Sequence, residues 1–425
     1  MKIILNRPIQ FLFLSALLAC FLQVSLYEIQ INFFFPVNLL LNKIPIIFLF
    51  LSVSIAFVTN NIKVSLSSEF FTWLLLLNIP LFIIPLLGLS LSIALNITDI
   101  SFDYNQIDYS GRMLNLLFLT AFSFALHNIF FREEQYHIPI KFYCYGTTLL
   151  ALTGIWQLLS FYSILPFPFE TRSYVHTVKV ETIAGRLTGM AAEPSYFVAF
   201  IADFMGLSFF ILRSRKNILY LYLFISIICL YYAFSPSGYI ILICSVTCPF
   251  FSMFLHKKTG KYLMALGPIL FIGAIYFIQS DGGFYFLERL KIADENSRYL
   301  MLTMPFNLIF NSNLTTAIFG YGIKSYSIIG PSMDFAGTSN NIFADILCES
   351  GILGFLSLLA FFIYIYYSIL KSIKISYTQK YIALFLFFDL LSSSIFRADY
   401  ATLRFYILIY TIYVLTYVDI QKELK

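Results

Sequence analysis

The chain has 425 residues, of which 60% are hydrophobic and only 12% are charged. An average soluble protein carries about 25% charged residues, so this composition excludes a soluble globular protein and favours a polytopic helical membrane protein. The net charge is +5, and the basic residues are not gathered in an aromatic-rich soluble segment, which argues against nucleic-acid binding. The six cysteines show neither a disulfide framework nor metal-ligand spacing.

Apolar runs close to the length that crosses a bilayer recur along the chain and predict about twelve membrane-spanning helices. In chain order these predicted helices cover residues 9–27, 37–58, 70–95, 112–131, 138–165, 193–212, 218–234, 238–255, 262–279, 342–370, 381–396 and 401–418. The first run resembles a signal peptide but lacks a small-residue cleavage site, so we expect it to remain as a helix. Pro45 interrupts the second run, and Pro80 and Pro85 predict a kink in the third.

Basic residues in three short turns between predicted spans define an orientation. They are Arg213, Arg215, Lys216, Lys257, Lys258, Lys261, Lys371, Lys374 and Lys380. With alternating spans, these turns lie on the same side as both termini, and the positive-inside rule makes that side cytoplasmic. The outer side then receives two long polar loops, residues 166–192 and 280–341, within a single membrane domain of residues 1–425. Helical spacing of apolar residues in the second loop predicts short amphipathic helices lying along the membrane surface.

The first long loop carries Arg186, although outer loops normally lack basic residues, so this arginine is expected to bind an anion. Gly185 and Gly189 flank it, and Glu193 opens the next helix. Glycines let the backbone approach a ligand while arginine binds its phosphate. The alternative is that Glu193 is an ordinary N-terminal helix residue with Arg186 as its surface partner.

The second long loop carries Arg289 and Arg298 in its amphipathic stretch. A Gly-Tyr-Gly turn centred on Tyr321 follows, and then Lys324. These groups are a second set of anion-binding candidates on the outer side.

Asn341, Asp345 and Glu349 follow at the start of the next predicted span. Their spacing at i, i+4 and i+8 places them on one helix face. They either line a site near the bilayer surface or form a solvated first turn with one buried pair.

Arg397 and Arg404 surround the short turn between the last two predicted spans. They either clamp an anion or pair with Asp399. Asp203 and Asp389 fall within spans, where a pathway role and a hydrogen-bonded packing role are both open.

Three motifs in this order, on this topology, resemble the bacterial O-antigen polymerase family (Wzy), within the wider group that includes the O-antigen ligases. The motif residues are Arg186, Gly189, Glu193, Pro194 and Ser195, then Arg298 with Gly320, Tyr321 and Gly322, and finally Asn341, Glu349, Gly351, Ile352 and Gly354. The resemblance covers nearly the whole chain, because the many spans and the two large outer loops belong to it.

The resemblance implies a glycosyltransferase of the bacterial inner membrane that polymerises undecaprenyl-diphosphate-linked oligosaccharide repeat units on the periplasmic face. It implies Glu193, Glu349 and Arg298 as catalytic residues. It further implies a substrate-binding set of Arg186, Arg289, Tyr321, Lys324, Asn341, Arg397 and Arg404. Membrane lipid and a chain-length regulator protein are the other implied partners. Because the lipid diphosphate holds the energy of the reaction, no nucleotide, metal or other cofactor is expected.

One departure from the family pattern concerns the base. Many relatives, particularly the ligases, carry histidine where this chain has Asn340, so activation of the acceptor would fall to Glu193 or Glu349. Two alternatives to the polymerase remain: an O-antigen ligase, which moves polysaccharide to lipid A–core, and a lipid-linked oligosaccharide flippase or other transporter. A transporter is expected to concentrate polar groups in mid-span positions and to have short outer loops.

Overall fold

The computed structural model describes residues 2–19, 47–48, 50–52, 54–55, 67–94, 109–131, 135–167, 169, 185–212, 215–256, 297–327, 329, 339–373, 375–397 and 400–418. Over these residues the chain forms helices and connecting turns, with no strand, as the composition predicts. Seven described stretches are long and apolar enough to cross a membrane: Ser68–Leu91, Gly111–Phe130, Pro194–Ile211, Lys216–Ala233, Pro236–Met253, Ile342–Lys371 and Tyr377–Phe396. The chain is therefore a helical membrane protein.

The helices follow one another as α1 (Lys2–Leu18), α3 (Ser68–Asn78), η2 (Ile79–Ile83), α4 (Ile84–Ala94), α5 (Tyr109–Leu126), η4 (His127–Phe131), α6 (His137–Phe161), α7 (Pro194–Ile211), α8 (Lys216–Ala233), α9 (Pro236–His256), α12 (Ser297–Phe310), α13 (Leu314–Phe319), α15 (Ile342–Lys371), α16 (Tyr377–Phe396) and α17 (Leu403–Tyr417). The predicted span at 262–279 and most of that at 37–58 lie outside the described residues. Helices α1 and α6, both predicted as spans, are not among the seven stretches.

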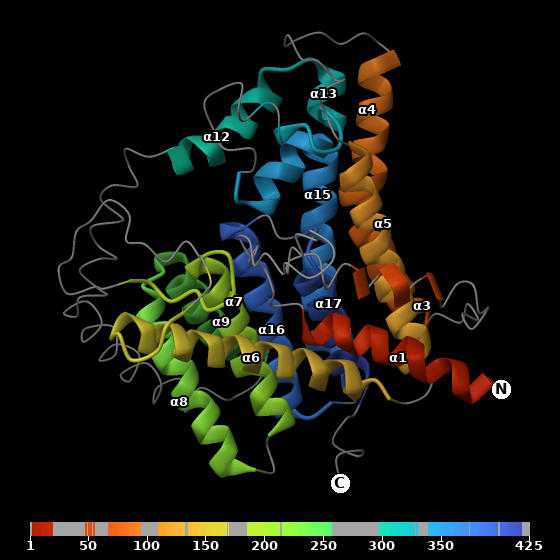
Figure 1. Cartoon of the computed structure of the whole chain (residues 1–425). Coiled ribbons are helices and arrows are strands. Elements are labelled where there is room, and N and C mark those ends of the chain that lie inside the picture. The colour runs from red at the N-terminus through yellow and green to blue at the C-terminus, as the bar shows by residue number, and fades with distance from the viewer. Residues whose placement is uncertain are drawn as a thin grey trace, which may run out of the picture.

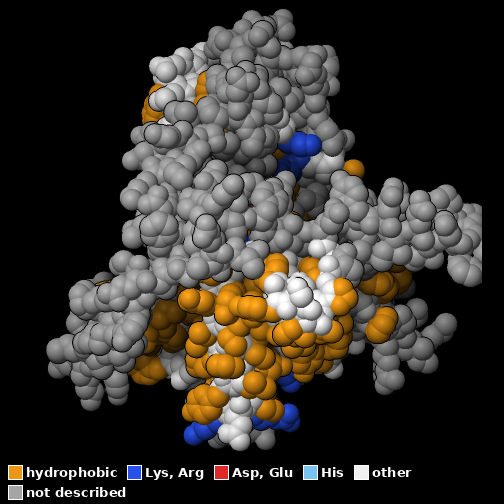
Figure 2. Space-filling model, turned by 60° about the vertical axis from the view of Figure 1, so that its left-hand side comes forward, with side chains coloured by type: hydrophobic (Ala, Val, Ile, Leu, Met, Phe, Trp, Pro, Cys, Tyr) orange, Lys and Arg blue, Asp and Glu red, His pale blue; other side chains and the backbone are white. Residues whose placement is uncertain are grey.

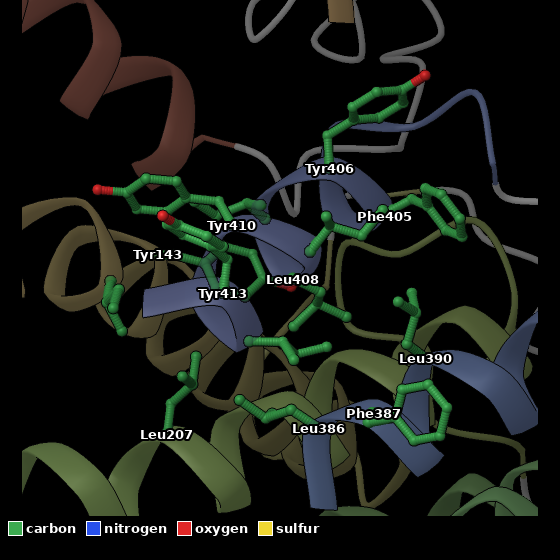
Figure 3. Packing of buried hydrophobic residues seen from close by; sticks show 14 of the residues in the cluster. Tyr143, Leu207, Leu386, Phe387, Leu390, Phe405, Tyr406, Leu408, Tyr410 and Tyr413 are labelled. Atoms are coloured by element: carbon green, nitrogen blue, oxygen red, sulfur yellow. The ribbon is translucent and has the colours of Figure 1, made fainter. Parts of the chain in front are cut away.

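The long helices α4, α5 and α15 run in roughly one direction, while α1 and α6 lie side by side across them (Figure 1). Helix α16 contacts α7, α9, α15 and α17 and so forms the centre of the bundle. Every residue of α17 from Arg404 to Thr416 is buried, which explains why this helix is apolar on all sides. Figure 3 shows its side chains, including Tyr410 and Tyr413, packed among those of neighbouring helices such as Leu207 and Leu386.

One end of the bundle, called here the Asn341 end, gathers the starts of α7 and α15 and the end of α16. The side-chain amide of Asn341 donates to the Ile395 carbonyl at 2.8 Å. Arg397 Nη1 donates to the Ser195 carbonyl at 3.4 Å. These bonds join segments far apart in the sequence.

The opposite end, called here the Lys371 end, gathers the end of α15, the start of α16 and the end of α17. Lys380 Nζ donates to the Leu370 carbonyl at 2.9 Å, and Ser372 Oγ donates to the Thr416 carbonyl at 2.7 Å. Helices α15, α16 and α17 therefore alternate in direction between the two ends of the bundle.

The described surface carries a band of hydrophobic side chains with Lys and Arg side chains gathered at its lower edge (Figure 2). Helix α8 exposes Tyr220, Phe224 and Ile227 by 64%, 61% and 60%. Such large exposed apolar groups on one helix face are suited to contact with lipid.

Candidate functional site at the Asn341 end

Asn341 caps α15. Its Oδ1 accepts hydrogen bonds from the backbone amides of Phe343 at 2.8 Å and Ala344 at 3.1 Å, while its Nδ2 donates to the Ile395 carbonyl. Asparagine is among the preferred capping residues because it satisfies amides that lack a partner within the helix. The structure thus gives this predicted substrate-binding residue a capping role.

Asp345 supports the same helix start. Its Oδ1 accepts bonds from the backbone amide of Ser339 at 3.1 Å and from the Ser339 hydroxyl at 2.6 Å, and the side chain is buried. The bonds fix the chain that enters α15, so this carboxylate belongs to the scaffold beneath the helix start rather than to a solvated first turn.

Helix α15 is broken at Gly351, whose φ of 62° and ψ of −163° suit only glycine. The Gly-Tyr-Gly turn docks at this break: the Tyr321 amide donates to the Cys348 carbonyl at 2.9 Å and the Gly322 amide to the Glu349 carbonyl at 3.0 Å. A Cβ on Gly320 would lie 2.4 Å from the Glu349 carbonyl carbon, so the close approach requires glycine. The turn therefore provides donors for backbone carbonyl groups next to the break.

A second irregular helix lies against the break. Pro80 and Pro85 lack the N–H groups that would bond one turn back, and the π-helical segment η2 occurs between α3 and α4. Ser350 Oγ donates to the Pro80 carbonyl at 2.8 Å. Two neighbouring helices are thus irregular at the same place, and the Ser350 hydroxyl provides a donor for a carbonyl of the proline-containing segment.

Arg112, Tyr400 and Glu349 form a chain of polar contacts beside this break. Arg112 Nη2 donates to the Tyr400 hydroxyl at 2.6 Å, and its Cζ lies 4.5 Å from the centroid of that ring. The Tyr400 hydroxyl donates to Glu349 Oε1 at 3.5 Å. Burial raises the pKa of the Tyr400 phenol well above its ordinary value, so the hydroxyl remains a donor.

Exposure differs along this contact chain. Glu349 and Tyr400 are 2% and 1% exposed, whereas Arg112 is half-buried. The backbone amide of Lys324 also hydrogen-bonds the Glu349 carboxylate. The structure therefore covers Glu349 and leaves Arg112 as the member nearest the surface.

Arg397 lies at the first turn of α7. Its Cζ lies 3.3 Å from the centroid of the Tyr196 ring, a stacking geometry that guanidinium favours. Glu193 is the N-cap residue of α7, is half-buried, and does not cap the helix with its side chain. The structure brings these two predicted residues to the same helix terminus.

Arg404, by contrast, is turned into the bundle. It pairs with both oxygens of Asp203, at 2.7 and 3.0 Å, and with Asp389 at 2.8 Å. Ser393 accepts a further bond at 3.0 Å, and Tyr143 donates to Asp203 at 2.5 Å. The partners of Arg404 are thus the two mid-span aspartates, and Asp399 lies outside the described residues.

The first long loop is tied to α6. Gln157 Oε1 accepts bonds from the amides of Thr188 at 2.7 Å and Gly189 at 2.8 Å, and Gly189 has a φ of 53°. Arg186 is buried, within electrostatic range of Tyr239. The glycine of this motif therefore permits a turn that fixes the loop on its neighbouring helix.

The remaining predicted residues belong to the second loop. Arg289 lies outside the described residues, and Arg298 lies in the first turn of α12 with its side chain outside the described part. Tyr321 is buried in the turn, and Lys324 is half-buried with a φ of 60°. The described part of this loop contains two short helices, α12 and α13.

Sequence reasoning missed Arg112 and Tyr400. Arg112 follows directly after a loop that the sequence predicts on the outer side, which is the same departure from charge bias that marked the long loops, so this signal was present. Tyr400 gave no such signal, because an isolated tyrosine near a membrane interface is common.

Comparison with known proteins adds no relative. No protein-family model, curated protein or solved structure matches this chain. Among the described residues, no group of three or more His, Cys, Asp or Glu side chains is placed to hold a metal ion.

Proposed function

We propose that this protein is a membrane glycosyltransferase that polymerises undecaprenyl-diphosphate-linked repeat units into O-antigen on the periplasmic face of the bacterial inner membrane. The observation that carries this proposal is the convergence of Arg397, Glu193 and Arg112 at the Asn341 end, where the sequence also predicts both long outer loops. Cations and a carboxylate at a membrane interface suit a lipid diphosphate donor and a sugar hydroxyl acceptor.

In the proposed reaction, an acceptor hydroxyl of one lipid-linked unit attacks the anomeric carbon of the growing chain. A new glycosidic bond forms and the bond from that carbon to the carrier diphosphate breaks, with the electron pair leaving on the phosphate oxygen. Arginines stabilise the charge that develops on the diphosphate. The hydroxyl proton passes to a carboxylate.

Glu193 is the carboxylate best suited to accept that proton. It is half-buried at the N-terminus of α7, the terminus that Arg397 contacts through Ser195, whereas Glu349 is 2% exposed and accepts a bond from the backbone of Lys324. A general base must come within hydrogen-bond reach of the proton it removes. Glu349 then supports the site from behind, through the hydrogen bond that it accepts from Tyr400.

A lipid-linked oligosaccharide flippase is the second candidate, because two observations favour it. Helix α15, a candidate span, is discontinuous at Gly351, and the Arg404, Asp203 and Asp389 network is buried within the bundle. Broken helices and intramembrane charges are frequent in transporters. The same features also serve as structural supports, as described above.

Lipopolysaccharide from a strain lacking this gene tests the proposal. A polymerase defect leaves lipid A–core capped by a single repeat unit, and the wild-type gene restores the ladder. Glu193→Gln should leave the protein inserted but reduce ladder formation by about 100-fold or more, the range typical of a general base. Lipid-linked polymer that remains unattached to core would instead indicate a ligase, and repeat units trapped on the cytoplasmic face would indicate the flippase.

A further inference from the structure

Helix α12, in the second outer loop, packs apolar side chains against α15. Met304 and Ile309 belong to a buried cluster that includes Leu347 of α15. The centroid of the Phe306 ring lies 6.2 Å from that of the Phe355 ring. These side chains of the loop are therefore covered by protein.

Three large apolar side chains remain exposed where α12 ends and α13 begins, and they are called here the apolar tip. Phe310, the last residue of α12, is 69% exposed, and Leu314, the first residue of α13, is 77% exposed. Ile318 lies one turn later on the same face of α13 and is also exposed. Grouped apolar side chains of this size on a surface mark a contact with another protein or with a membrane.

The helix that carries the apolar tip lies against two candidate spans. Helix α13 contacts α4 and α15, and the three helices lie side by side in Figure 1. A Cβ on Gly88 of α4 would lie 2.4 Å from the Phe319 carbonyl oxygen, and a Cβ on Gly351 of α15 would lie 2.5 Å from the Ile318 carbonyl oxygen. The end of α13 therefore touches the backbone of both spans.

The start of α3 and the end of α15 lie at the same level of the bundle. Ser67, which caps α3, hydrogen-bonds the Tyr413 hydroxyl. Ser372, which follows α15, donates to the Thr416 carbonyl at 2.7 Å. Because Tyr413 and Thr416 lie within one turn of α17, depth along both spans can be measured from this level.

Helix α13 lies at the opposite boundary of the hydrocarbon core. Gly88 lies 20 residues after Ser68, the first residue of α3, and Gly351 lies 20 residues before Lys371, the last residue of α15. At 1.5 Å per residue each stretch is about 30 Å long, which is the thickness of the hydrocarbon core. Since the Lys371 end is predicted to face the cytoplasm, α13 belongs at the outer boundary.

The exposed apolar faces of both spans extend to α13. They consist of Leu353, Leu356, Ile363 and Tyr367 on α15, and of Ile83 and Leu87 on α4. Leu87 is next to Gly88, and Leu353 is two residues after Gly351. The surface that suits lipid is therefore continuous from each span to the place where α13 docks.

We propose that the apolar tip inserts into the outer leaflet of the bilayer, with lipid acyl chains as its partner, and anchors the second outer loop there. Ile318 lies two residues before Gly320, so a tip held in lipid fixes the depth of the Gly-Tyr-Gly turn that docks on the break in α15. This inference depends on the predicted orientation of the bundle and not on the proposed reaction.

Fluorescence quenching of the full-length protein in phosphatidylcholine nanodiscs tests the anchor. In a background whose native cysteines are replaced by serine, Leu314→Cys carries an environment-sensitive NBD label. Phosphatidylcholine with a nitroxide on its acyl chain should quench this label at least about half as strongly as a label on Leu356→Cys, whereas aqueous iodide should quench it little. A label on Ile373→Cys, at an exposed position after the end of α15, should show the reverse.

A second variant separates anchoring from simple exposure. Phe310→Ser combined with Leu314→Ser should lower the nitroxide quenching of a label on Ile318→Cys about twofold or more, because binding at the interface scales with the apolar area buried there. Leu356→Ser is the matched control, since it removes an exposed leucine from a span, and it should leave this quenching unchanged. Gel filtration and thermal unfolding establish that each variant is folded.

Strong iodide quenching of the Leu314→Cys label without nitroxide quenching would place the tip in water and overturn the proposal. Protection from both quenchers would overturn it too, because the tip would then be covered by protein, such as a second copy of this chain. Since no step of the measurement uses substrate, its result is independent of whether the protein polymerises repeat units.

Discussion

At the scale of single residues, bonding partners distinguish two charged groups that sequence reasoning placed together and that are equally buried, at 2% exposure each. Arg397 and Arg404 both follow the end of α16, and the sequence alone makes them equally good candidates for binding an anion. The structure stacks Arg397 on Tyr196 and directs Arg404 into the bundle against Asp203 and Asp389. Direction differs because Arg404 has entered α17, where its position on the helix points it at α7 and α16.

Breaking the Arg404 network should destabilise the fold. Arg404→Met leaves two buried carboxylates without their cation, and loss of one partner from a buried ion pair costs about 3–5 kcal/mol. Asp389→Asn should cost less, because Asp203 still pairs with Arg404 through two bonds. Thermal unfolding in detergent, followed by tryptophan fluorescence, measures both variants. Equal melting temperatures for Arg404→Met and the wild type would contradict a structural role.

At the scale of elements, the apolar runs predict where helices lie, but they do not predict every irregularity inside a helix. Predicted spans at 70–95, 193–212 and 342–370 correspond to Ser68–Leu91, Pro194–Ile211 and Ile342–Lys371. Pro80 and Pro85 predict an irregular helix, because proline lacks a backbone N–H group in any surroundings. The break at Gly351 was not predicted, since glycine breaks a helix only when another segment docks there.

Gly351→Ala should destabilise the protein. An alanine adopts this φ and ψ at a cost of about 1–3 kcal/mol, and its Cβ would lie 2.5 Å from the Ile318 carbonyl oxygen. Gly185→Ala is the matched control, because its Cβ meets the ring of Phe161, a side chain that can rotate away. Thermal unfolding of the two variants should show a clear loss for Gly351→Ala and a smaller one for Gly185→Ala. The reverse order would refute the docked break.

At the scale of the whole molecule, the sequence predicts alternating helix directions, and the contacts at both ends of the bundle agree for α15, α16 and α17. Hydropathy and charge placement predict this order for the three helices, because successive spans cross in opposite directions. They are insufficient for the site, which depends on which helix ends become neighbours. Arg112 and Tyr400 are 288 residues apart in sequence, and no local pattern connects them.

Thiol labelling tests the orientation of the bundle. In a background whose native cysteines are replaced by serine, Asn340→Cys lies at an exposed position of the Asn341 end, and Ile373→Cys lies at the Lys371 end with 95% exposure at the native residue. A membrane-impermeant maleimide added to intact spheroplasts should label Asn340→Cys and should reach Ile373→Cys only after lysis. The opposite labelling pattern would invert the topology and remove the periplasmic site.

The docking of the Gly-Tyr-Gly turn on the break in α15 limits how this protein can be recombined with others. Backbone-to-backbone bonds join the Gly-Tyr-Gly turn of the second loop to helix α15, so neither segment has a satisfied main chain alone. Transplanting the loop into another scaffold would strand carbonyl groups in lipid unless residues 319–354 travelled as a unit. Chimeras that divide this unit should fail to accumulate.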